Sequence, residues 1–86
     1  MEDNEILGEQ ILEIVQNQLK ANDPPETRLT FDRLKEDGYT QNQIEQMIGS
    51  CVIVEIYDVL KSGKEFDEKR YIGNLKKLPK APFGQE

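Results

Sequence analysis

The sequence contains no histidine and no tryptophan, and among its 86 residues there is one cysteine, Cys51. A single cysteine excludes an internal disulfide, and without histidine the Cys/His ligand spacings of zinc sites are excluded as well. Histidine is also the most common general base near neutral pH. We therefore expect a protein that binds no metal or other cofactor and is not an enzyme.

Long apolar runs are also missing. No stretch approaches the roughly 18 apolar residues that a membrane-spanning helix needs. The first residues, MEDNE, are acidic where a signal peptide would be basic. Charged residues make up 33% of the chain and hydrophobic residues 36%, which is typical of a soluble protein. We expect a cytoplasmic protein that does not contact a membrane.

The charge is predominantly acidic but unevenly distributed, with a formal net value of −6. Residues 1–22 carry five acidic side chains against one basic residue, Lys20, whereas residues 64–86 carry six basic and four acidic side chains. An acidic protein repels nucleic acid and anionic lipid. We therefore expect no nucleic acid partner, and either an unidentified protein partner or self-association.

Hydrophobic periodicity predicts helices along most of the chain. In residues 5–20, apolar side chains recur at spacings of three and four residues, as on one face of an amphipathic helix. The predicted helices cover residues 5–20, 24–37, 41–62 and 68–78. A chain of this length forms one domain with a small core. We expect that domain over residues 1–79, ended by Pro79, and a loose tail over residues 80–86.

Start and stop signals delimit these helices. The start signals are the N-cap residues Asp23, Thr40 and Asp67, and the stop signals are Gly38 and Gly63. Thr40 and Gln43 also have the spacing of a capping box, in which each side chain bonds the other residue's main-chain N–H. These signals predict where the second, third and fourth helices begin and where the second and third end.

The segment MIGSCVIVEIYDVL, residues 47–60, holds the longest apolar run. Its β-branched residues 52–54 favour a strand locally, but the distance from Thr40 to Gly63 is several times the length of an average strand and favours one helix. At about 100° per residue, apolar side chains occupy opposite faces of that helix. One face holds Ile44, Ile48, Cys51, Val52 and Val59, and the other holds Ile53, Ile56 and Leu60. We therefore expect an all-α fold of four helices with a central, largely buried third helix.

Two polar residues lie inside apolar stripes and are the main candidate site. Glu55 falls between Cys51 and Val59 on the third helix, and Gln18 lies among the apolar residues of the first. A buried carboxylate must be paired, hydrogen-bonded or protonated. Glu55 is therefore either a structural link between helices, with Gln18 as a possible partner, or part of a ligand site. Cys51 has no residue nearby in sequence that would lower the pKa of a thiol, so we expect it to be buried and inert.

The segment LKEDGYTQNQIEQMIG, residues 34–49, resembles the start of a DNA-binding helix-turn-helix. In that arrangement, the following residues SCVIVEIYDVL would form the helix that enters the major groove. These residues include no Arg, Lys, Asn or Gln to read base edges. DNA binding is therefore the weakest of the alternatives.

Residues 4–79 also resemble a family of small bacterial all-helical domains of unknown function. The matching motifs are IVQNQL, DPPETR, RLKEDGY, EIYDVLKSGKEFD and RY...L..LP, in this order. The resemblance implies an all-helical fold with no assigned activity. It further implies histidines in many members at positions that correspond here to Asn4, Gly8, Leu12, Asn42 and Gln46. Paired histidines on two facing helices could bind a metal, but this sequence has none of them.

The leading hypothesis is a non-enzymatic protein-binding or accessory module. The alternative is a degenerate metal-site or small-ligand-binding protein that uses Glu55 and Gln18, with Asn42 and Gln46 as further polar candidates. A solvent-open cavity that reaches Glu55 would favour the alternative. A Glu55 enclosed among internal partners would favour the binding module.

Overall fold

The computed structural model describes residues 2–82, and it describes side chains from residue 8 onward. The elements are four helices: α1 (Glu2–Ala21), α2 (Pro25–Glu36), α3 (Gln41–Ser62) and α4 (Glu68–Lys77). α3 contacts each of the other three helices. The predicted all-α fold with a central third helix is confirmed. Of the predicted tail, residues 83–86 lie outside the described residues.

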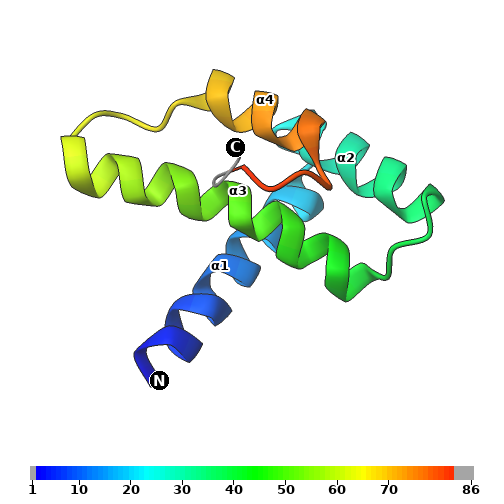
Figure 1. Ribbon diagram of the computed structural model, residues 1–86, viewed down its shortest axis with the longest axis horizontal. Helices are drawn as coiled ribbons and strands as arrows, with labels where there is room; N and C mark the ends of the chain where they lie inside the picture. Colours follow the sequence, from blue (N-terminus) through cyan, green and yellow to red (C-terminus); the bar gives the residue numbers. More distant parts are fainter. Residues whose placement is uncertain (1, 83–86) are drawn as a thin grey trace.

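The helices are arranged around α3, which runs across the whole molecule (Figure 1). α4 lies along α3 and also contacts α2. α1 crosses α3, and its N-terminal half diverges from the other helices (Figure 1). α4 therefore lies against the middle of α3 on one side, and α1 does not follow the C-terminal part of α3 on the other (Figure 1).

Local hydrogen bonds fix the ends of α3 as the sequence predicts. The Thr40 hydroxyl accepts from the Gln43 main-chain N–H, and the Gln43 side chain accepts from the Thr40 N–H, which completes the capping box. At the other end Gly63 has a φ of 72°, a left-handed conformation that glycine adopts without steric cost. α3 is continuous from Gln41 to Ser62. The DNA-binding alternative requires a second helix to begin near Ser50, and none begins there.

The start of α2 differs from the prediction. Its N-cap is Pro24, not Asp23, and no side chain caps this end. The Thr27 N–H donates to the Pro24 carbonyl, so the first helical residue is Pro25. A proline fits the first helical turn because the N–H it lacks has no partner within the helix. Asp67, by contrast, caps α4 as predicted, because its carboxylate accepts from the Arg70 N–H.

The core lies on one face of α3, between that face and the other helices. It contains Ile11, Val15, Leu34, Ile44, Ile48, Cys51, Val52, Tyr71, Leu75 and Leu78. The opposite face of α3 is covered only in part. Ile53 and Ile56 are half-buried, whereas Leu60 is 76% exposed. The predicted burial of the third helix therefore fails at this end, because α1 diverges from α3 there.

Candidate functional site

Glu55 is fully enclosed and has a complete set of partners. Its side chain is 0% exposed. Arg70 donates from Nε to one carboxylate oxygen at 2.7 Å and from Nη2 to the other at 3.0 Å. The main-chain N–H of Asp67 donates to the same carboxylate at 3.2 Å. The two-pronged Arg70 contact is the strong form of an ion pair.

These contacts join the middle of α3 to the first turn of α4. Arg70 also pairs with Asp58 at 3.0 Å, one turn further along α3. Hydrogen bonds to Glu55, and then to Asp58, raise the pKa of Arg70 above its ordinary value. The N-terminus of a helix favours a negative charge, so α4 itself supports the position of Glu55. This geometry supports the interpretation of Glu55 as a structural link.

Gln18 belongs to a second, uncharged network. Its side-chain oxygen accepts from the Thr27 hydroxyl at 2.8 Å and from the Tyr71 hydroxyl at 2.7 Å. Both hydroxyl-bearing residues are buried. Burial raises the pKa of Tyr71 to about 12, and the hydrogen bonds to Thr27 and Gln18 counteract part of that rise. Gln18 therefore connects α1 with α2 and α4.

The expected pairing of Glu55 with Gln18 is therefore wrong. Glu55 bonds Arg70 and Gln18 bonds Tyr71, so two neighbouring residues of α4 serve separate networks. Sequence reasoning missed Arg70, although it is the only arginine in the predicted fourth helix. A buried glutamate needs a cationic partner, and the one arginine in the predicted fourth helix was the signal in the sequence that could have identified Arg70.

Cys51 lies between the two networks, one turn before Glu55 on α3. It is fully buried, as predicted. Burial raises the pKa of the thiol to about 12, with a smaller contribution from the charge of Glu55 and a lowering effect from Ser50. The thiol therefore stays protonated near neutral pH, and the nucleophilic thiolate form is not populated.

The other two candidates, Asn42 and Gln46, lie on the opposite side of α3 from Glu55. Both are exposed. At about 100° per residue their side of the helix continues through Ile53, Tyr57 and Leu60. We call these five residues the open face of α3. The four polar candidates are therefore not one site, since Glu55 and Gln18 are internal and Asn42 and Gln46 are external.

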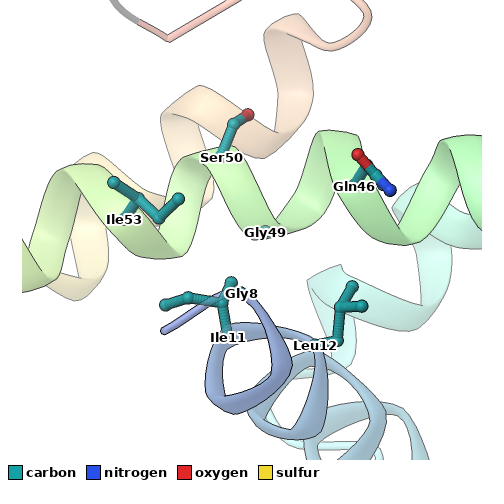
Figure 2. A pocket seen from close by; sticks show the side chains of 7 residues that line it. All are labelled: Gly8, Ile11, Leu12, Gln46, Gly49, Ser50 and Ile53. Atoms are coloured by element: carbon teal, nitrogen blue, oxygen red, sulfur yellow. The ribbon is translucent and has the colours of Figure 1, made fainter. Parts of the chain in front are cut away.

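A cavity of about 190 Å³ opens beside the point where α1 crosses α3 (Figure 2). From α1 it is lined by Gly8, Ile11 and Leu12, and from α3 by Gln46, Gly49, Ser50 and Ile53. The crossing is close because Gly49 has no side chain. A Cβ at that position would lie 3.0 Å from Cγ2 of Ile11.

The cavity has a mainly apolar lining with two polar groups. The Ser50 hydroxyl is occupied, since it donates to the Met47 carbonyl at 2.6 Å. The Gln46 amide makes no hydrogen bond to any side chain or main chain within residues 8–82. Asn42 lines an adjoining hollow that Gln46 also borders. This arrangement suits an apolar group with one polar neighbour.

Three positions that the family resemblance assigns to histidine meet at this cavity, namely Gly8, Leu12 and Gln46. The side chain of Asn4 lies outside the described residues. Glycine and leucine supply no side-chain ligand for a metal ion. Over residues 8–82, no three His, Cys, Asp or Glu side chains gather closely enough to hold one.

Comparison of the chain with protein-family models, with curated proteins and with solved structures found no match. The resemblance to small bacterial helical domains therefore stays a prediction. Between residues 2 and 82, none of the helices is both long and apolar enough to cross a lipid bilayer.

Proposed function

We propose that the protein is a non-enzymatic binding module of the bacterial cytoplasm, and that the open face of α3 binds a partner protein. The observation that carries the proposal is the exposure of Tyr57 and Leu60, which are 71% and 76% exposed. Large apolar side chains that adjoin one another at a surface are typical of protein-binding sites. The cytoplasmic location is proposed because the chain has a single cysteine, whereas secreted proteins of this size are often rich in disulfides.

The partner is expected to present an apolar side chain next to an acidic one. The crossing cavity, at about 190 Å³, is smaller than the roughly 300 Å³ at which small-molecule pockets begin, and it suits a single inserted side chain. A second hollow further along α3 is lined by Tyr57, Leu60 and Lys61. An ammonium group beside two exposed apolar side chains complements a carboxylate at the edge of an apolar contact.

The internal networks support binding over catalysis. Glu55 is enclosed and fully partnered, and the Gln18 oxygen accepts two hydrogen bonds. Neither group is free to exchange a proton with a substrate or to hold a ligand. The alternative, a small-ligand protein that uses Glu55 and Gln18, requires both groups to face an open cavity.

Site-specific photo-cross-linking tests the proposal. A benzoylphenylalanine probe replaces Tyr57 on the open face, and a matched probe replaces Lys69, an exposed residue of α4. After irradiation in an extract of the source cells, one discrete adduct is expected from position 57 only. The cross-linked protein is then purified and its affinity for the unmodified chain is measured.

Leu60→Glu places a charge in the apolar contact and should weaken that affinity by at least about tenfold, with unchanged thermal unfolding. Lys69→Glu is the control and should have little effect. A dimer of the chain itself as the only adduct would identify the partner as a second copy. Equal adducts from both probes, or full affinity of the Leu60→Glu variant, would contradict the proposal.

A further inference from the structure

A separate hollow of about 370 Å³ lies where the end of α1, the side of α2 and the start of α3 meet. Three basic residues border it: Lys20, Arg28 and Lys35. Phe31 forms part of the wall, with the Arg28 guanidinium 5.3 Å and the Lys35 ammonium 5.9 Å from the centre of its ring. These distances are within the range of cation–π contacts, which hold the two cations at the rim.

The hollow also contains a buried acid with an incomplete set of partners. Glu45 is 7% exposed. One carboxylate oxygen, Oε2, accepts from the Gln41 side-chain amide at 3.0 Å. The other oxygen, Oε1, receives no hydrogen bond or ion pair from the part of the chain whose side chains the structure describes. Buried carboxylates are normally paired with several donors, so this oxygen has capacity for a further one.

The basic residues are likewise short of anionic partners. Among residues 8–82, Lys20 and Lys35 form no ion pair, and Arg28 has only a long, exposed contact of 3.7 Å with Asp32. The first turn of α3, which also borders the hollow at Gln41, contains no acidic residue. A helix N-terminus attracts negative charge. Three cations therefore gather around one hollow in a protein whose net charge is −6.

We propose that this hollow binds a short acidic peptide segment of the partner protein. The carboxylates of the segment would contact Lys20, Arg28 and Lys35, and a main-chain N–H would donate to Oε1 of Glu45. A peptide supplies both groups, whereas inorganic phosphate and the sugar–phosphate backbone of a nucleic acid have no N–H to donate. The inference names the chemistry of the partner and so rests on the proposed function, but it concerns a different surface.

The test uses the full chain and an acetylated, amidated hexaglutamate peptide, with calorimetry at low and moderate salt. Binding is expected at low salt and should weaken as salt rises. The double variant Lys20→Ala/Lys35→Ala should lose at least about tenfold in affinity. The matched control Lys64→Ala/Lys69→Ala removes the same charge from exposed positions near the start of α4 and should lose less than about twofold.

The Glu45→Gln variant distinguishes a specific hydrogen bond to Glu45 from electrostatic attraction between the peptide and the basic side chains. Removal of an acid from a basic hollow would strengthen the binding of any anion by electrostatics alone. The proposed N–H contact to Oε1 predicts the opposite, a loss of about threefold to tenfold, because a charge-assisted hydrogen bond becomes a neutral one. Thermal unfolding of each variant verifies that the fold is retained.

The inference is overturned if hexaglutamate does not bind, or if Glu45→Gln binds it as tightly as the wild type or more tightly. It is also overturned if the control variant loses as much affinity as Lys20→Ala/Lys35→Ala, or if inorganic phosphate or a thymidine oligonucleotide competes equally well. If these results occur while Leu60→Glu still weakens partner binding, only the acidic-segment inference fails. If Leu60→Glu has no effect while hexaglutamate binds as expected, the open-face proposal fails instead.

Discussion

The two buried glutamates of α3 have opposite surroundings. Glu55 is fully enclosed and accepts three N–H donors from Arg70 and Asp67. Glu45 is nearly as buried, yet among residues 8–82 it accepts one donor, the Gln41 amide. Burial is thus similar for both residues, and the number of donors is what differs. A buried acid with a complete set of donors stabilises the fold, whereas one with an incomplete set is a candidate for binding.

The difference follows from what packs against each end of α3. Glu55 faces the first turn of α4, which supplies a main-chain N–H and a short path for the Arg70 guanidinium. Glu45 faces the hollow between α1 and α2, where two of the bordering basic side chains, Arg28 and Lys35, lie over the ring of Phe31 instead.

The largest effect is expected at Glu55. Glu55→Ala leaves the Asp67 N–H without its acceptor and opens a cavity, so the free energy of unfolding should fall by about 2–4 kcal/mol. Urea unfolding monitored by circular dichroism measures it. Asp58→Ala, which removes the partly exposed partner of the same arginine, is the control and should cost less than about 1 kcal/mol. A Glu55→Met variant more stable than the wild type would contradict a structural role.

Alkaline pH should weaken the Glu55 end of the core next. Burial raises the pKa of Cys51 from 9.0, and of Tyr71 from 10.0, to about 12 in each case. The unfolded chain loses these protons at a lower pH than the folded protein does. The free energy of unfolding should therefore be unaffected by these two groups below pH 8 and fall as the pH rises from 9 towards 12.

At pH 10 the loss should be roughly 1–2 kcal/mol relative to pH 8, from about 1.4 kcal/mol per pH unit for each ionising group. Urea unfolding at several pH values gives the slope. Cys51→Ala should make the slope between pH 8 and 10 shallower, even though the variant is less stable overall. An unchanged slope in that variant would show that Cys51 is not the group responsible.

The uncharged network around Gln18 should contribute less to stability than the contacts of Glu55. Tyr71→Phe removes one of the two hydroxyl donors to Gln18 and leaves the Thr27 donor in place. The expected cost is about 1 kcal/mol, typical of one buried hydrogen bond between neutral groups. Thermal unfolding at neutral pH measures this cost. A loss as large as that of Glu55→Ala would show that the two networks contribute equally to stability.

The smallest effect is expected at Glu45. Glu45→Gln keeps the shape and the hydrogen bond from Gln41, and it removes a charge that forms no ion pair with residues 8–82. The free energy of unfolding should change by less than about 0.5 kcal/mol in either direction. Chemical denaturation measures the free energy of unfolding of both Glu45→Gln and Glu55→Gln. The Glu55→Gln variant should be clearly destabilised. Equal destabilisation of both variants would remove the distinction between the two glutamates.

Much of the fold could be predicted because its signals are local. The capping box at Thr40 depends on atoms within one helical turn, and the left-handed Gly63 needs only its own backbone freedom. The burial of Cys51 and Glu55 follows from the periodicity of α3. At Asp23 the local signal was ambiguous, because an aspartate followed by two prolines leaves two adjacent positions for the cap.

The candidate site could be predicted only in part, because its contacts cross between helices. Periodicity gives the face on which Glu55 and Gln18 lie, but not which residue of another helix lies opposite. The Glu55–Arg70 pair spans 15 residues and the Gln18–Tyr71 pair spans 53, so both depend on how α4 is placed after the loop at residues 63–67. Glu45 was missed because it lies at the edge of the apolar stripe.

Side-chain spacing and hydrogen bonds within a turn specify the four helices, both ends of α3, the start of α4 and the apolar face of α3, so these features could be read from the sequence. The tertiary structure decided which buried acid has a complete set of donors and which part of α3 remains open. The crossing of α1 at Gly49 leaves Tyr57 and Leu60 exposed, and the docking of α4 supplies donors to Glu55 but not to Glu45. Both outcomes depend on the angles at which helices pack, which side-chain periodicity does not specify.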